Sequence, residues 1–389
     1  MTKPARLELL GGLSPHAFMR QHWQKKPLLI RQAIPGMQPL IAREALFELA
    51  QQHDVESRLV RGNGLAEPWQ LQHGPFKRRQ LPPLSRSCWT LLVQGVDLQV
   101  DAMAALRDRF RFLPDARLDD VMVSFATEGG GVGPHVDSYD VFLLQAHGRR
   151  RWRIGPQKNI RLKEGEPLKI LAEFKPTHTW VLEPGDMLYL PPHYAHEGVA
   201  VGECMTYSMG FKAETMHGLA GALMARLADQ EPFGHDHRYA DPQALPAKRP
   251  ANIPANLQDF ARQSLMQVLQ KKDAVDVALG EWLTEPKPQV WFEGRAGARL
   301  PRAVRLDRRT QMLYDARHVY INGESWRCQG DDARWLKTLA DQRCLTPVQL
   351  AQTSAALRLQ LQAWWQAGWL QALVVNRDNR VSVANSPII

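Results

Sequence analysis

Cysteine is scarce in this 389-residue chain: Cys88, Cys204, Cys328 and Cys344 lie far apart, and none belongs to a CxxC pair. This spacing excludes a disulfide framework and a structural zinc knuckle, and it favours a reducing, cytoplasmic location. No apolar run approaches the roughly 20 residues that cross a bilayer. The N-terminus has two early cations but no sustained apolar core, so we expect neither a membrane partner nor a signal peptide.

The chain also lacks an internal repeat and low-complexity tracts, which argues against solenoids, propellers and long disorder. Hydrophobic residues make up 44% and charged residues 23% of the sequence, an ordinary globular composition. The length predicts about two to three domains. The formal net charge of +9 fits either a basic soluble protein or a partner of RNA, and charge alone favours neither strongly.

Short and often alternating strands are predicted within residues 116–213, where Gly and Pro separate them. The predicted strands are Val121–Ala126, Val141–Ala146, Arg150–Ile154, Trp180–Leu182, Met187–Leu190 and Met205–Phe211. Strands at this spacing favour a sandwich or a small barrel over alternating βα units. Upstream, we expect a helix capped by Ser14, a strand at Leu28–Ile30 and a helix at Ala42–Gln51.

The remaining chain is mixed in character. Residues 214–290 predict one helix through Leu219–Leu227 and a second near Leu257–Leu283, an amphipathic pair that could pack on the barrel or on a second subunit. Residues 291–389 predict short strands and the helices Asp332–Asp341 and Thr346–Ala367, an order that resembles a winged helix. Because the last helix is poor in lysine, we favour protein packing over nucleic-acid contact for this module.

A histidine and an acid lie two positions apart in the segment GPHVD of residues 133–137. Side chains alternate along extended backbone, so His135 and Asp137 point to one side and can take adjacent positions on one metal. The candidate third ligand is His196 in PPHYAHE, which follows an apolar strand and the turn EPGD. Two histidines and one carboxylate leave the opposite metal positions open for a co-substrate and dioxygen, as in non-haem Fe(II) oxygenases.

Other assignments stay open from the residues alone. His193 directly follows a Pro-Pro turn, where exposure is expected, and His147 also lies nearby in the sequence. Asp140 lies an odd number of positions from His135, so in a strand it faces the other way. The pair of His135 and Asp137 could be a structural hydrogen bond, and manganese or cobalt could occupy the same ligands as iron.

An arginine-rich strand, GRRRWRI at residues 148–154, provides a second clue. If Trp152 and Ile154 face the barrel interior, Arg150 faces inward with them, and the arginines between them face out. An inward cation is costly unless an anion meets it, and a guanidinium can grip a carboxylate with two hydrogen bonds. The dicarboxylate 2-oxoglutarate would satisfy both the cation and the open metal positions.

The segments GGVGPHVDSYDVF (130–142), GRRRW (148–152) and EPGDMLYLPP (183–192) together resemble the bacterial JmjC-type ribosomal oxygenases. The upstream pattern of Phe18 followed by WQKKPL at residues 23–28 is similar to the same family. So is the order of barrel, helical pair and winged helix, so the resemblance covers essentially the full chain. It is closest to the bacterial ribosomal arginine hydroxylases.

The resemblance implies an α+β fold in three parts. Residues 1–213 would form a JmjC double-stranded β-helix, a cupin-type barrel with N-terminal helices. Residues 214–290 would form a helical dimerisation region, and residues 291–389 a winged-helix-like C-terminal domain. The expected assembly is a homodimer.

The resemblance also implies chemistry: an Fe(II)- and 2-oxoglutarate-dependent dioxygenase that hydroxylates an arginine on the sixteenth large-subunit ribosomal protein. His135, Asp137 and His196 match the iron ligands, and Arg150 matches the co-substrate clamp. Tyr139 and Ser208 fall in or near the expected substrate pocket, although such residues in strands are usually plain packing residues.

The metal triad alone does not separate arginine hydroxylation from three alternatives. These are hydroxylation of another residue such as histidine on a ribosomal protein, lysine demethylation, and a metal-binding scaffold that contacts RNA without catalysis. Because enzyme and substrate would both be basic, recognition requires local acids, and Asp115, Asp119 and Asp120 precede the first barrel strand. For each acid singly, a solvated turn is the favoured interpretation.

Overall fold

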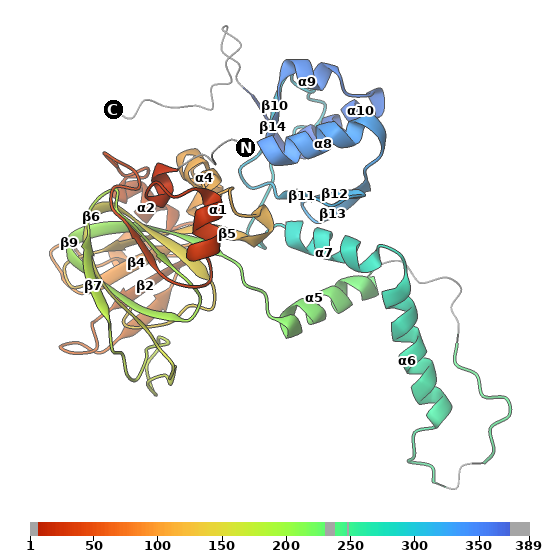
Figure 1. Cartoon of the computed structure of the whole chain (residues 1–389), viewed down its shortest axis with the longest axis horizontal. Coiled ribbons are helices and arrows are strands. Elements are labelled where there is room, and N and C mark those ends of the chain that lie inside the picture. The colour runs from red at the N-terminus through yellow and green to blue at the C-terminus, as the bar shows by residue number, and fades with distance from the viewer. Residues whose placement is uncertain (1–6, 230–237, 247–248, 374–389) are drawn as a thin grey trace. The chain divides into compact units, whose positions relative to one another are not determined.

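The computed structural model describes residues 7–229, 238–246 and 249–373. Residues 374–389 of the predicted C-terminal domain and residues 1–6 of the predicted barrel domain lie outside this part. The chain divides into two compact units. One contains the described residues up to Ala213 with Gln289–Trp291, and the other contains those of Glu214–Pro288 and from Phe292 onward (Figure 1). No described helix is long and apolar enough to cross a membrane.

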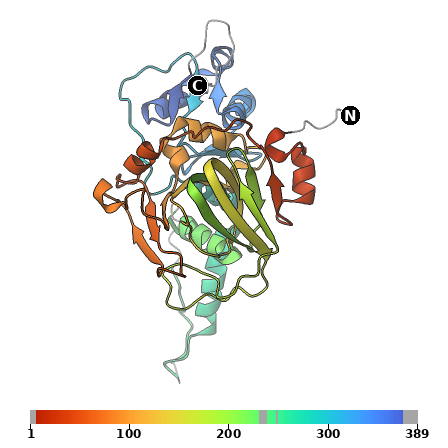
Figure 2. The ribbon, with the colours of Figure 1, turned by 90° about the vertical axis from the view of Figure 1, so that its left-hand side faces the viewer.

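The first unit is built on a nine-stranded antiparallel sheet (Figures 1 and 2). Eight of its strands follow the order β1-β8-β6-β9-β5-β4-β2-β3, and the ninth, β7, pairs with β6. Its strands are β1 (Leu28–Ile30), β2 (Ser57–Arg61), β3 (Gln70–His73), β4 (Trp89–Val93), β5 (Leu118–Ala126), β6 (Asp140–Pro156), β7 (His178–Leu182), β8 (Met187–Leu190) and β9 (Tyr194–Phe211). Its α-helices are α1 (Pro15–Gln21), α2 (Arg43–Leu49), α3 (Val96–Gln99) and α4 (Asp101–Asp108), and the 3-10 turns are Glu8–Leu10, Arg78–Gln80 and Asp115–Arg117.

Strand β6 is one long strand where the sequence predicted two, Val141–Ala146 and Arg150–Ile154. Its pairing with β9 shifts register on either side of His147, which marks an irregularity rather than an end. Gly148 explains the apparent gap: its φ of +59° favours glycine, and a Cβ there would lie 2.0 Å from the carbonyl oxygen of Glu203. The pairing of β6 with β9 therefore continues past the irregularity, from Asp140 opposite Phe211 to Pro156 opposite Tyr194.

The EPGD turn before β8 is fixed by its aspartate. The Asp186 carboxylate accepts hydrogen bonds from the backbone N–H groups of Gln32 and Glu183, at 3.0 and 3.1 Å, and pairs with Arg31 at 2.6 Å. Burial raises the pKa of Asp186, but these hydrogen bonds and the Arg31 charge prevail and hold it below its usual value. The turn thereby ties β1 to β8 and sets the direction of the chain toward β9.

The second unit consists of helices α5 (Met216–Asp229), α6 (Ala255–Gln270), α7 (Ala274–Thr284), α8 (Gly330–Gln342), α9 (Pro347–Ala351) and α10 (Ala355–Gln366) with two small sheets. The sheets contain β10 (Val304–Leu306), β14 (Cys344–Leu345) and β15 (Leu370–Ala372), and β11 (Met312–Tyr314), β12 (His318–Ile321) and β13 (Glu324–Arg327). A buried cluster centred on Leu339, Leu361 and Trp364 joins α8 and α10 to these sheets.

Two predicted helices are each divided in the structure. The helix predicted at Leu257–Leu283 breaks before α7, where Asp273 takes a left-handed φ of +65°. The helix predicted at Thr346–Ala367 breaks because Ser354 caps α10: its Oγ accepts the N–H of Leu357 at 3.1 Å. A serine competes for backbone donors and so favours a helix start over a helix interior.

Candidate metal and co-substrate site

The three predicted metal-binding side chains meet at one point of the barrel. One ligand atom from each of His135, Asp137 and His196 lies within 4.8 Å of the other two. The Nε2 atoms of His135 and His196 lie 3.9 and 3.5 Å from the Asp137 carboxylate oxygens. Separations of this order suit ligands around one metal at roughly 2.0–2.2 Å from each.

Backbone hydrogen bonds hold the two histidine segments together. His135 and His196 form an isolated antiparallel bridge, in which each backbone N–H donates to the other carbonyl at 3.0 and 2.9 Å. The backbone N–H of His193 donates to the Asp137 carbonyl at 2.7 Å. Neither His135 nor Asp137 lies in a regular strand, so this bridge, rather than strand alternation alone, sets their positions.

Hydrogen bonds to the Nδ1 atoms determine which ring nitrogen of each histidine faces the metal position. Nδ1 of His135 lies 2.9 Å from the Gly133 carbonyl, and Nδ1 of His196 lies 3.0 Å from the Tyr194 carbonyl. A carbonyl can only accept, so each Nδ1 carries the proton and each Nε2 keeps its lone pair for a metal. Burial and the neighbouring His135 lower the pKa of His196 to about 4 against the opposing effect of Asp137, so its imidazole is neutral at physiological pH.

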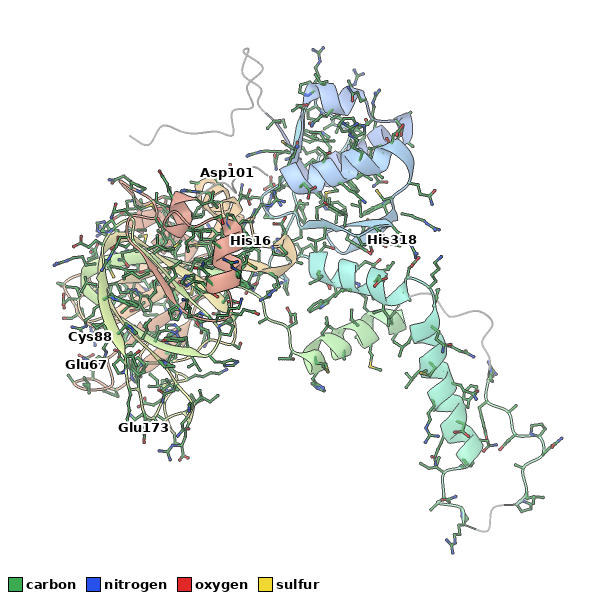
Figure 3. The ribbon with its side chains drawn as sticks, viewed as in Figure 1. His16, Glu67, Cys88, Asp101, Glu173 and His318 are labelled. Carbon is green, nitrogen blue, oxygen red and sulfur yellow. The ribbon has the colours of Figure 1, made fainter. Side chains whose placement is uncertain are left out.

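Two loops meet the segment that bears His135. Gly133 has a φ of +75°, and a Cβ there would lie 2.4 Å from Ile170 and 3.1 Å from Trp69. The backbone N–H of Leu171 donates to the Pro134 carbonyl at 2.8 Å. Figure 3 labels Glu67 and Glu173, which mark these two loops on the same lower side of the first unit. Only glycine allows both loops to approach the metal-binding segment this closely.

A cavity of about 410 Å³ opens beside the triad. All six sequence-predicted site residues line it: His135, Asp137, His196, Arg150, Tyr139 and Ser208. Apolar walls come from Met122, Val141, Leu143 and Trp152. The structure thus brings the predicted residues to one place, in a cleft of the size that holds small ligands.

Arg150 is 5% exposed and lines this cavity. Its Nε and Nη2 have no hydrogen-bond partner among the described residues, and its guanidinium lies 5.8 Å from the centroid of the Trp152 ring. The burial of Arg150 and Trp152 matches the predicted alternation. Gly198 makes room for the indole, because a Cβ there would lie 2.7 Å from the ring. A buried guanidinium with two open donors fits a bound carboxylate.

The competing sequence candidates lie elsewhere. His193 and His147 are exposed. Asp140 is fully buried on the other face of β6, where it accepts the hydroxyl of Tyr189 at 2.6 Å and the side-chain amide of Gln24 at 3.1 Å. These bonds account for both Asp140 oxygens and tie the barrel to the chain after α1.

The three acids that the sequence offered as substrate contacts differ in whether they reach the cavity. Asp115 pairs with Arg111 at 2.6 Å and does not line the cavity. Asp119 and Asp120 do line it, and Asp120 is only 5% exposed, so the favoured interpretation of a solvated turn is wrong for Asp120. Asp120 reaches the cavity because β5 begins at Leu118, three residues earlier than Val121.

Tyr139, which was predicted to lie in or near the substrate pocket, interacts electrostatically with three acidic side chains. Burial, followed by the charges of Asp137, Asp120 and Asp119, raises the pKa of Tyr139 far above its usual value, while Arg58 acts in the opposite direction. The phenol is neutral at physiological pH even without this shift, and it can donate a hydrogen bond. Arg58 and Gln94 also line the cavity and were not predicted from the sequence.

Comparison with known proteins identifies the fold. A JmjC domain family model matches residues 105–219, and a ROXA-like winged helix model matches residues 264–371. The chain is 36% identical over 276 residues to the ribosomal protein uL16 3-hydroxylase of Escherichia coli K12, covering 70% of this chain and 72% of that protein.

Solved structures agree. The crystal structure of E. coli ycfD superposes with a TM-score of 0.81 at 30% identity, covering 92% of this chain and 98% of that one. A structure of the ribosomal oxygenase YcfD from E. coli in complex with cobalt and 2-oxoglutarate superposes with a TM-score of 0.77 at the same identity. These matches confirm the predicted JmjC barrel followed by a winged helix, and this chain belongs to the JmjC-domain ribosomal oxygenases.

Proposed function

We propose that this protein is an Fe(II)- and 2-oxoglutarate-dependent hydroxylase of an arginine side chain on the large-subunit ribosomal protein uL16. The observation that carries the proposal is one cavity that contains a metal-binding triad, an unpartnered buried arginine and a pair of acids. The uL16 3-hydroxylase of E. coli supports the substrate protein, and Asp119 and Asp120 support the substrate side chain.

Each part of the cavity has a separate task. His135, Asp137 and His196 would hold the metal through two imidazole nitrogens and one carboxylate, a donor set that suits Fe(II). Arg150 binds the distal carboxylate of 2-oxoglutarate and so orients its keto-acid end toward the triad. When bound, iron and 2-oxoglutarate supply the oxidising chemistry, in which dioxygen hydroxylates the substrate and decarboxylates the co-substrate to succinate.

The remaining groups place the substrate. Asp119 and Asp120 bind the guanidinium of the substrate, because a carboxylate can accept two hydrogen bonds from this group. The Asp120 carboxylate also accepts the backbone N–H of Gly95 at 2.8 Å, which holds the Asp120 side chain in place. Tyr139 and Ser208, which line the same cavity, add hydrogen-bonding groups for the substrate. The apolar walls exclude water around the site, and the fixed geometry contributes through positioning.

The test is turnover with a defined peptide. Purified protein with Fe(II), ascorbate and 2-oxoglutarate is expected to produce succinate and to add one oxygen atom to an arginine in a uL16 peptide, as located by tandem mass spectrometry. The control peptide carries lysine in place of that arginine and should stay unmodified. Oxygen on a histidine instead would overturn the arginine assignment. No succinate together with tight RNA binding would favour the scaffold alternative.

We also propose that residues 214–290 mediate homodimerisation and that residues 291–389 form the winged-helix-like part of the chain, which the structure joins to these helices in one compact unit. Helices α5 and α6 and the start of α7 expose an unusual set of apolar side chains: Met216, Met224, Leu257, Leu265, Met266, Leu269 and Val275. Exposed apolar side chains in such number on neighbouring helices are typical of an interface between subunits.

A double Leu265→Asp, Met266→Asp variant is therefore expected to be monomeric by analytical ultracentrifugation, because each side chain is 54% exposed in the single chain and would bring an unpaired charge into the interface. Leu359→Asp is the control, since Leu359 is 72% exposed on α10 and lies outside the proposed interface. A monomeric wild-type protein, or a variant that still dimerises, would contradict the proposal.

A further inference from the structure

The cavity contains a second arginine whose presence the metal and the co-substrate do not explain. Arg58 lies on β2 and lines the same cavity as Arg150. It forms no ion pair with any described residue, and its buried Nε has no hydrogen-bond partner. A buried donor without a partner costs about 1–3 kcal/mol, so a bound ligand is the natural source of compensation.

An acceptor without a partner lies beside it. Gln94 also lines the cavity, and its buried Oε1 accepts no hydrogen bond within the described chain. Its position follows from the sheet: Arg58 pairs with Leu92 on β4, and the backbone N–H of Gln94 extends this pairing by donating to Glu56 at 2.9 Å. Residues 92 and 94 share one face, which makes Gln94 the diagonal neighbour of Arg58 at about 7–8 Å between Cα atoms.

We propose that Arg58 and Gln94 bind the main chain of the substrate polypeptide. The Arg58 guanidinium donates to a peptide carbonyl, and the Gln94 side-chain oxygen accepts a peptide N–H. The proposal rests on the proposed function in one respect, that the substrate is a polypeptide. It assigns to this subsite the task of holding the backbone while the acids hold the reacting side chain.

A main-chain amide fits this subsite better than an acidic side chain of the substrate does. A donor and an acceptor without partners on neighbouring strands match the two groups of a peptide unit. A carboxylate bound to Arg58 would meet the Gln94 oxygen and would lie in the same cavity as Asp119 and Asp120, where like charges repel. A neutral amide avoids this repulsion.

The experiment measures binding of a fluorescent uL16 peptide to the Mn(II)- and 2-oxoglutarate-loaded protein. Arg58→Met, which keeps the apolar stem, is expected to weaken peptide binding about 10- to 100-fold, and Gln94→Leu about 3- to 10-fold. The KM for 2-oxoglutarate and its peptide-independent consumption should stay unchanged. Arg61→Met is the matched control: Arg61 lies three residues along β2 and also has a buried Nε without a hydrogen-bond partner, but its guanidinium bonds to Gln72 and it does not line the cavity.

Peptides with an altered backbone provide the decisive test of the proposed main-chain contact. In a series of peptides, each has one amide replaced by an ester, which lacks the N–H that Gln94 accepts. At one position of this series the ester should weaken binding to the wild type. The same ester should not weaken binding to Gln94→Leu any further, because that variant has already lost the acceptor. Arg58→Lys, which keeps the charge, should bind with intermediate affinity, and thermal unfolding of every variant reports whether it has folded.

Three results would overturn the proposal. Arg58→Met could bind the peptide as tightly as the wild type does, or it could raise the KM for 2-oxoglutarate without weakening peptide binding. In the third result, Arg58→Met binds the peptide more weakly than the wild type does, but this difference disappears when an acidic side chain of the peptide is replaced by a neutral one. A wild type that binds the peptide without adding oxygen would refute the proposed function alone, and the binding comparison would still decide the role of Arg58. A wild type that binds no peptide would refute both.

Discussion

An Asp137→Ala variant is expected to lose measurable hydroxylation and to bind Fe(II) more than about 100-fold more weakly than the wild type. Residues that merely orient metal ligands cost about 10- to 100-fold in metal affinity when they are replaced, so the loss of a direct ligand should exceed this range. The Asp137 carboxylate also lies within 3.9 Å of both imidazole Nε2 atoms and supplies the only negative charge of the triad. Anaerobic calorimetry with Fe(II) and the succinate assay measure the two effects.

The control for this variant is His147→Ala. His147 is an exposed histidine that the sequence left open as an alternative ligand, and its loss should change neither metal affinity nor turnover. The fold should survive the replacement of Asp137, because the backbone bridge between His135 and His196 does not use its side chain. An Asp137→Ala variant that bound iron and turned over normally would refute the metal site.

Arg150→Met is expected to raise the KM for 2-oxoglutarate about 10- to 100-fold, because charge-assisted hydrogen bonds to a carboxylate contribute about 1.5–3 kcal/mol. The metal affinity should stay unchanged. A 2-oxo acid without the distal carboxylate separates this role from general damage: the wild type should discriminate strongly against it, and the variant should not. Steady-state kinetics with both co-substrates measure the difference.

Arg150→Met is expected to keep or increase the stability of the fold, although it weakens binding of the co-substrate. Arg150 is 5% exposed with two unpartnered nitrogens, so a methionine of similar length should leave the free energy of unfolding unchanged or raise it. Arg151→Met is the control, since Arg151 is exposed on the other face of β6. An unchanged KM in Arg150→Met would show that this guanidinium does not bind the co-substrate.

The sequence predicted the parts of the site that short motifs encode. His135, Asp137 and His196 could be chosen because metal chemistry requires their residue types together, and Arg150 because alternation along β6 sets its direction. The open choice between His193 and His196 depended on exposure after a turn; of the two, only His196 is buried, and it belongs to the triad.

The missed parts lie where local pattern carries little information. Strand β4 is buried along its whole length, WTLLV, and a short continuous apolar run does not distinguish a strand from a helix. Arg58 and Gln94 reach a cavity formed by residues far along the chain only through the pairing of β2 with β4, and neither strand was predicted. Asp120 was named as a candidate contact, but its assignment to a solvated turn was wrong for a related reason: its burial depends on neighbouring strands and not on its own sequence context.

The reciprocal hydrogen bonds between His135 and His196 have a consequence for how this protein acquires its metal. Because protein hydrogen bonds join the two histidine segments and orient both rings, we expect that no folding step accompanies ion uptake. Removal of the ion by a chelator should therefore leave a native apoprotein, so that one preparation can be stripped and reconstituted repeatedly with different divalent ions.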